Sequence, residues 1–241
     1  MSTGARAGFL ESAVQKLFMR RARVDAVDDL SAHFRMIALT GEGLQGADWT
    51  PGDKVQIQLG SWTQRTYTPL HWDPIEGRTR ILAYLHGDGP GTVWARAARA
   101  GDVCHLFGPR KSIDLGRLQP PAVLFGDETS IGLAAALHAT ATTDGIELLF
   151  ESSNPSESVQ VTDTLGLSKA QHCARSDGQG LSPDLERRLL SLVEAHHPAG
   201  FALTGKSTSI QQIRQLLRRH GFSAAHFQTR AYWAPGKRGL D

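Results

Sequence analysis

The chain has 241 residues, and its 26 Lys and Arg nearly balance its 24 Asp and Glu, which gives a formal net charge of +2. This balance gives no reason to expect a nucleic-acid partner, because nucleic-acid binders gather many cations on one face. No stretch approaches the roughly 20 apolar residues that span a bilayer, so we expect no membrane span.

The first half of the chain reads as a series of short strands. Each strand candidate partly alternates apolar and polar residues and is bounded by Gly, Asp or Pro, which is typical of an antiparallel sheet or barrel. A short helix is predicted around Val93–Ala98. The strand candidates cover residues 16–30, 33–41, 53–60, 64–70, 79–87 and 102–109.

The pattern of predicted elements changes after Pro120 and Pro121, which fit neither a central strand nor a helix interior. Strands alternate with helices there, which indicates a doubly wound parallel sheet. Ser182 followed by Pro183 is typical of a helix start, and Gly221 of a helix end. The strands are predicted at 122–127, 146–152, 170–176, 200–205 and 224–233, the helices at 128–141, 182–195 and 207–221, and a helical or irregular stretch at 156–166.

We therefore expect two domains. Residues 1–118 are predicted to form an antiparallel β-barrel, and residues 119–241 a doubly wound α/β domain of the nucleotide-binding kind. The N-terminal segment lacks the apolar region of a secretory signal. Cys104 and Cys173 lie far apart and form no CxxC pair, which fits a reducing, cytoplasmic compartment and leaves too few thiolates for a zinc or iron–sulfur site.

Residues 65–68, Arg-Thr-Tyr-Thr, lie on a strand candidate. Alternation puts Arg65 and Tyr67 on one face, where an arginine fork can bind phosphate and a tyrosine ring can stack on a flat ligand. Thr68 points to the other face unless the strand bends at Pro69. The alternative interpretation is an exposed barrel strand with a cross-strand pair.

Residues 86–98 read HGDGPGTVWARAA, a glycine-rich approach to a helix start. Glycines let the backbone come close to a ligand, and the free N–H groups of a helix N-terminus bind anions. Thr92 can add a hydroxyl to the same phosphate. The alternative interpretation is a turn that leads into a capped helix.

In their order and spacing these motifs resemble the siderophore-interacting protein family, the FAD-dependent ferric-siderophore reductases within the ferredoxin-reductase-like flavoproteins. The resemblance extends from Val24 to Gly236. It rests on the two segments above and on GD at 101–102, FGPRKS at 107–112, GDETS at 126–130 and YW at 232–233.

The resemblance implies that Arg65 contacts the FAD pyrophosphate, Tyr67 packs beside the isoalloxazine and Thr68 bonds a ring heteroatom. GDETS replaces the Gly-Gly-Thr-Gly of ordinary ferredoxin-reductase relatives and is expected to lie close to the cofactor, at the carboxyl end of the first strand of the second domain. The full set of implied cofactor residues is Arg65, Thr66, Tyr67, Thr68, His86, Gly89, Gly91, Thr92, Val93, Trp94, Asp127, Thr129, Tyr232 and Trp233.

Residues 200–207, GFALTGKS, formally match a phosphate loop, but FALTG is itself the predicted strand, whereas a phosphate loop follows one. We expect this strand end to receive a pyridine dinucleotide instead, with Lys206 near a phosphate. Lys206, Lys237 and Arg238 are the cations expected to meet an acidic iron chelate. For the choice between NADH and NADPH, two readings stay open: Glu151 can hold a ribose, while Ser152 and Ser153 can accept a phosphate.

The resemblance implies an FAD-dependent reductase of ferric siderophores that takes electrons from NADPH, NADH or a ferredoxin and uses no catalytic acid or base. One alternative is an NAD(P)H oxidoreductase of the same fold that passes electrons to an iron–sulfur protein or free flavin. The other is a non-redox siderophore-binding protein.

Overall fold

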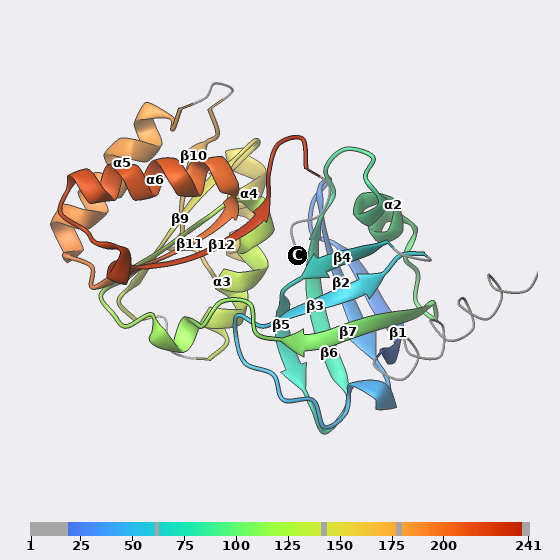
Figure 1. Cartoon of the computed structure of the whole chain (residues 1–241). Helices are drawn as coiled ribbons and strands as arrows, with labels where there is room; N and C mark the ends of the chain where they lie inside the picture. The colour runs from blue at the N-terminus through green and yellow to red at the C-terminus, as the bar shows by residue number, and fades with distance from the viewer. Residues whose placement is uncertain (1–18, 61–62, 141–143, 177–179, 238–241) are drawn as a thin grey trace, which may run out of the picture.

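A computed structural model of the chain describes residues 19–60, 63–140, 144–176 and 180–237. Two sheets stand side by side, as Figure 1 shows: an antiparallel sheet built from the first half of the chain, and a parallel sheet flanked by helices built from the second half. The expected fold class is confirmed. Within the described residues, no helix is both long and apolar enough to cross a membrane.

The first sheet has seven antiparallel strands in the order β4-β3-β7-β1-β2-β6-β5. Short apolar-polar alternation produces it, because every second side chain turns into a shared core that includes Val24, Ile37 and Leu106. The helix α2 (Pro90–Ala97) lies between β6 and β7. The strands are β1 (Arg20–Asp29), β2 (Phe34–Thr40), β3 (Lys54–Gln58), β4 (Gln64–Tyr67), β5 (Pro69–Asp73), β6 (Arg78–Tyr84) and β7 (Val103–Arg110).

Thr68 alone separates β4 from β5, although these two strands form opposite edges of the sheet. The sheet must therefore curl back on itself, which gives it a barrel-like shape. No ladder joins β4 to β5 in the described part of the chain, so this barrel is not closed. Thr68 consequently lies at the seam between the two edges.

The second sheet has five parallel strands in the order β10-β9-β8-β11-β12. Along β8, Ala122 and Leu124 pack on one face with α3 and α4, and Val123 and Phe125 on the other with α5 and α6. The strands are β8 (Ala122–Gly126), β9 (Ile146–Ser152), β10 (Gln171–Ala174), β11 (Gly200–Lys206) and β12 (Phe227–Trp233), and the helices are α3 (Ile131–His138), α4 (Pro155–Thr164), α5 (Pro183–His196) and α6 (Ser207–Arg219).

Helix α3 joins the two halves. Its residues up to Leu137, IGLAAAL, are apolar all round and are buried between the sheets. Phe34, Met36 and Leu70 of the first sheet belong to the same core as the residues of α3. A Cβ on Gly132 would lie 3.4 Å from Leu70 Cδ1, so a glycine at this position lets the strand after Thr68 pack closely on the helix. This contact brings the carboxyl end of β8 to the seam at Thr68.

The structure differs from the sequence expectations in a few places. The single strand expected at 64–70 is two strands, because the chain bends at Thr68. The first helix begins at Pro90 rather than Val93, and the segment 224–226 is a 3-10 turn (η4, Ala224–His226) before β12 rather than part of the strand. Residues 16–18 lie outside the described residues, and the domain division at 118/119 stays a prediction.

Candidate functional site

Strand β4 and the start of α2 meet at Gly91. A Cβ at this position would lie 3.1 Å from Arg65 Cγ and 3.3 Å from the Tyr67 hydroxyl, so the absence of a side chain allows the helix start to lie against the strand. The Tyr67 ring also packs on Trp94, with 5.8 Å between the ring centroids. The structure thus brings together the two halves of the cofactor site that the sequence resemblance implies.

The first turn of α2 offers backbone donors. Its first helical bond runs from Val93 N–H to the Gly89 carbonyl at 3.0 Å, so the N–H groups of Gly91 and Thr92 precede the intrahelical ladder. Pro90 has no N–H, and Gly89 has no capping side chain. The Thr92 hydroxyl donates to the His86 carbonyl at 2.8 Å, so Thr92 offers a ligand its backbone N–H rather than its hydroxyl.

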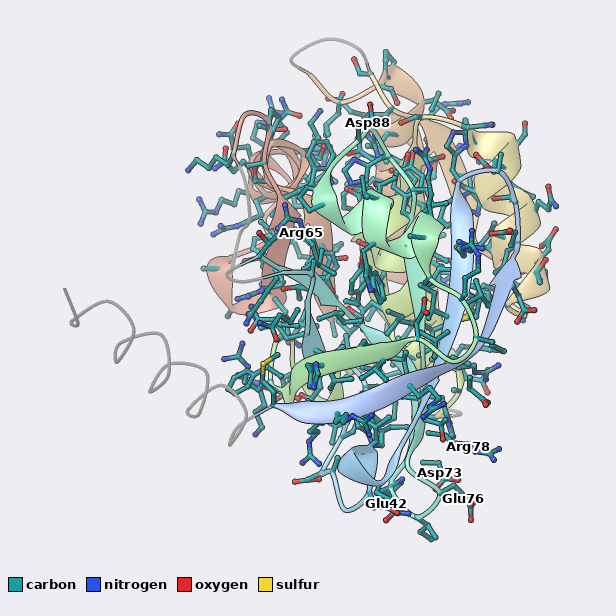
Figure 2. The ribbon with its side chains drawn as sticks, turned by 90° about the vertical axis from the view of Figure 1, so that its right-hand side faces the viewer. Glu42, Arg65, Asp73, Glu76, Arg78 and Asp88 are labelled. Carbon is teal, nitrogen blue, oxygen red and sulfur yellow. The ribbon has the colours of Figure 1, made fainter. Side chains whose placement is uncertain are left out.

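Arg65 supplies the positive charge of this end of the molecule. Its Nη1 donates to the neighbouring Gln64 carbonyl at 2.7 Å, and a guanidinium carries further N–H donors in the same plane. Figure 2 shows Arg65 and Asp88 in the part of the first half that lies away from the turn carrying Asp73 and Glu76. Burial raises the pKa of Tyr67, which keeps its hydroxyl protonated and able to donate. This end therefore combines a cation, two backbone donors and an aromatic face, which suits a flat, phosphorylated ligand.

His86 is exposed and stacks on Tyr84, with ring centroids 5.5 Å apart. Tyr84 in turn donates to Glu128 Oε1 at 3.3 Å, across to the second sheet. Val93, on the outer side of α2, leaves 56% of its surface exposed. These predicted residues flank the meeting point of β4 and α2.

A second group gathers at the carboxyl ends of β8 and β11, between which the strand order reverses. An open α/β sheet binds its ligands at such a switch point. Asp127, directly after β8, is fully buried and accepts hydrogen bonds from Thr129 N–H at 2.9 Å and Trp233 Nε1 at 2.7 Å. Gly205 has a φ of 94°, and a Cβ there would lie 2.5 Å from the Asp127 carboxylate, so this position requires glycine. Burial raises the pKa of Asp127.

Tyr232 and Trp233 reach two different partners. The pairing of β11 with β12 shifts between Gly205 and Lys206, which leaves Tyr232 as an extra residue in the strand. Thr68 donates a hydrogen bond to the Tyr232 hydroxyl, and burial raises the pKa of Tyr232 to about 12. The end of β12 is therefore attached to the first sheet through Tyr232 and to the second through Trp233.

Glu128 and Arg175 also belong to this region, although the sequence did not single them out. Glu128 is buried, accepts from Ser153 N–H at 2.7 Å and forms an ion pair with Arg175. Arg175 Nε lies 3.7 Å from Glu151 Oε1, and Glu151 also accepts from Ser209. Glu128 stands inside the GDETS motif, which was a usable signal; Arg175 lies near the end of the strand predicted at 170–176 and gave none.

Two of the three predicted substrate cations, Lys206 and Lys237, lie within the described residues. Lys206 Nζ lies 5.8 Å from the centre of the Trp233 ring. Lys237 is exposed in the turn after β12, the segment that lies between the two halves in Figure 1. Arg238 lies outside the described residues. The segment GFALTGK forms the strand β11 itself, which confirms that it is not a phosphate loop.

Residues 60–113 match the family model of the siderophore-interacting FAD-binding domain. Among solved structures, the chain is similar to a siderophore utilization protein from T. fusca, with 21% identity, a TM-score of 0.73, and coverage of 92% of this chain and 95% of that one. The siderophore-interacting protein SipS from Aeromonas hydrophila gives 22% identity, a TM-score of 0.70 and coverage of 91% and 93%.

The ferredoxin reductase of carbazole 1,9a-dioxygenase gives 18% identity, a TM-score of 0.70, and coverage of 88% of this chain and 68% of that one. The matched segment contains β4, Gly91 and the first turn of α2, the part of the molecule where cation, backbone donors and aromatic face meet. Residues 60–113 are therefore similar to a siderophore-interacting FAD-binding domain, and the whole chain has a ferredoxin-reductase-like fold.

Proposed function

We propose that the protein is an FAD-dependent reductase of ferric siderophores that works in the cytoplasm and releases ferrous iron. The observation that carries this proposal is the close approach of Gly91 to Arg65 and Tyr67, inside a segment that matches the siderophore-interacting FAD-binding domain.

The described residues fit FAD at this end of the first sheet. Arg65 and the backbone N–H groups of Gly91 and Thr92 would hold the pyrophosphate, because a guanidinium fork and a helix N-terminus both favour phosphate oxygens. Tyr67 would pack beside the ring system, and Thr68, at the seam between the two edges of the first sheet, would bond a ring heteroatom. FAD, when bound, supplies the link between a two-electron donor and a one-electron acceptor.

A ferric siderophore holds iron through oxygen donors that favour the ferric ion, so one added electron per iron weakens the complex. Two electrons taken from one NAD(P)H thus reduce two ferric ions, whereas a ferredoxin delivers its electrons singly. No proton transfer by a side chain is needed, so the protein's tasks are to bind the cofactor, admit a donor and attract an acidic chelate. Lys206, Lys237 and Arg238 are the cations that we assign to this last task.

A second candidate is an NAD(P)H oxidoreductase of the same architecture that reduces an iron–sulfur protein or free flavin. The similarity to a ferredoxin reductase favours it, because that likeness covers 88% of the chain. It would use the same cofactor residues. A non-redox siderophore-binding protein is disfavoured by the presence of both Arg65 and the glycine approach at Gly91.

The experiment is an anaerobic visible spectrum of the purified protein, first alone, then with NADPH or NADH, then with a ferric siderophore. We expect a yellow protein that bleaches with the donor and regains its colour when the chelate is added, while a ferrous trap such as ferrozine turns coloured. A protein that bleaches but is reoxidised only by an iron–sulfur protein or free flavin would favour the second candidate. A protein that cannot be reconstituted with FAD would overturn both.

A further inference from the structure

A cavity of about 760 Å³ lies between the two halves of the molecule. Pro120 and Ile146, which line it, adjoin the amino-terminal ends of β8 and β9, whereas the switch point lies at the carboxyl ends of the same sheet. Leu137, near the end of α3, also lines it, while the start of α3 follows the GDETS motif. None of the described residues that line the cavity belongs to the candidate cofactor site, so the two sites are separate.

The segment between β7 and β8 forms one wall of the cavity and is attached at both of its ends (Figure 1). Ile113 N–H donates to the Gly52 carbonyl of the first half at 3.2 Å, and Ala122 N–H donates to the Gly145 carbonyl of the second half at 2.9 Å. A Cβ on Gly52 would lie 2.2 Å from the Ile113 carbonyl oxygen, so the first attachment requires glycine. A molecule in this cavity therefore contacts both halves of the chain.

Most of the cavity wall is apolar. Leu115 and Leu118 line it from the segment between β7 and β8, and Leu137 and Ile146 line it from the second half. All four side chains are at least nine-tenths buried. Cavities of this size with apolar walls and a few polar groups hold drug-sized ligands and are common between domains. The wall thus suits a ligand with an apolar or aromatic body.

The charged groups on the wall are mainly acidic. Among the described lining residues, Asp53, Asp114 and Asp144 carry three carboxyl groups against the single ammonium group of Lys111. Asp53 is only 6% exposed, and it accepts the Thr50 N–H at 3.0 Å and the Thr50 hydroxyl at 3.4 Å, both at Oδ2. A carboxylate can accept about four hydrogen bonds, so Asp53 has acceptor capacity left for a ligand.

We propose that this cavity binds a small amphipathic cation, that is, a protonated amine attached to an apolar or aromatic body. The body lies against Leu115 and Leu118, and the ammonium group donates to Asp53. Such a charge-assisted bond is about twice as strong as a neutral one, and an anion would be repelled by the three carboxylates. Because the site uses no residue of the flavin end, it does not depend on the proposed function.

The test uses three probes that share a dansyl ring system and differ in charge. Dansylcadaverine carries a protonated amine, N-pentyldansylamide is neutral, and dansyl-6-aminohexanoate carries a carboxylate. Binding to the purified protein is measured by isothermal calorimetry, which flavin absorbance does not disturb. An excess of FAD in cell and syringe keeps the probes out of the candidate cofactor site.

We expect the amine to bind about tenfold more tightly than the neutral probe, the usual effect of a hydrogen bond to a charged group, and the carboxylate to bind most weakly. Asp53→Asn should bring the amine to the affinity of the neutral probe, since an asparagine oxygen still accepts the bond from Thr50. Asp48→Asn is the matched control, because Asp48 is exposed and lies outside the lining. Equal binding of the amine and the carboxylate, or a preference for the amine that Asp53→Asn retains, would overturn the inference.

Ser112→Trp locates the site independently of Asp53. Ser112 lines the cavity and is half-buried, so an indole there takes up space without removing a core side chain. We expect this variant to lose measurable binding of the amine at concentrations up to about 1 mM, and thermal melts show whether each variant is folded. An amine that binds folded Ser112→Trp as tightly as wild type, or that binds wild type more weakly than about 1 mM, contradicts the assignment of the cavity.

Discussion

Two helix starts in this molecule face the same physical problem and solve it in opposite ways. At α2 the sequence Gly-Pro-Gly-Thr supplies no side-chain cap, and the N–H groups of Gly91 and Thr92 remain outside the helical ladder. At the turn before α3 the sequence Gly-Asp-Glu-Thr supplies Asp127, which accepts from Thr129 N–H within the chain. A helix N-terminus is an anion site only where the chain does not provide its own anion.

The arginines near the two helix starts differ in the same way, since one has no carboxylate partner among the contacts described above and the other pairs with buried carboxylates. Arg65 lies beside α2 on a half-buried strand with a backbone carbonyl as its partner. Arg175 lies near the start of α3 and is bound by the buried Glu128 and approached by Glu151. One arginine is therefore suited to an external phosphate, and the other neutralises internal carboxylates.

The largest effect is expected from Arg175→Met. This change leaves the buried Glu128 and Glu151 without their cation, so we expect the free energy of unfolding to fall by about 3 kcal/mol, the usual cost of removing one partner of a buried ion pair. Urea denaturation followed by circular dichroism measures it. Arg187→Met is the control, because Arg187 pairs with Asp184 at the surface with 73% of its side chain exposed and should change stability little. If both changes lower the free energy of unfolding equally, Arg175 is not needed to neutralise the buried carboxylates near the start of α3.

A smaller effect is expected from Gly91→Ala, which places a methyl group 3.1 Å from Arg65 Cγ and so displaces the Arg65 side chain from the helix start. We expect FAD binding to weaken by about tenfold, while stability is unchanged or slightly higher because Ala favours helices over Gly. Flavin fluorescence titration of the apoprotein measures the affinity. Gly180→Ala is the control, since a Cβ there also has nothing within 4 Å and the residue lies in the second half of the chain. If Gly91→Ala binds FAD as wild type does, the close approach is not needed for the site.

The smallest effect is expected from Glu151→Gln, on the pH dependence of the free energy of unfolding. Burial raises the pKa of Glu151 above the ordinary value, so the folded protein holds the proton more tightly than the unfolded chain. The resulting stabilisation is present below the ordinary pKa of 4.5 and is lost as pH rises through the raised value. We expect Glu151→Gln to flatten the decline of unfolding free energy as pH rises above about 4.5. Urea titrations at several pH values check this, with the exposed Glu186→Gln as control. If the unfolding free energy of Glu151→Gln declines with rising pH as steeply as that of the wild type, Glu151 is not the cause of the decline.

The local features of this molecule were predictable from the sequence, and the distant pairings were not. Alternation and turn residues predicted the strands, and the glycine approach and Arg65 were visible because each lies in one short segment. Asp127 and Trp233 are 106 positions apart, and Glu128 and Arg175 are 47 apart. Their pairing depends on the strand order of the second sheet and on the bulge at Tyr232, which no local pattern encodes. For the same reason the sequence resemblance placed Asp127 near a cofactor but did not show that it caps the 3-10 turn (η3, Glu128–Ser130) that leads into α3.

The central claim is that the end of the first sheet at β4 and α2 binds FAD, and Arg65→Ala tests it most directly. The measurement is the FAD content of the purified variant, from the ratio of absorbance near 450 nm to that at 280 nm, alongside its circular dichroism spectrum. We predict a folded protein that has lost its flavin, because the change removes a phosphate partner and no core residue. A folded variant that keeps full flavin occupancy would contradict the assignment.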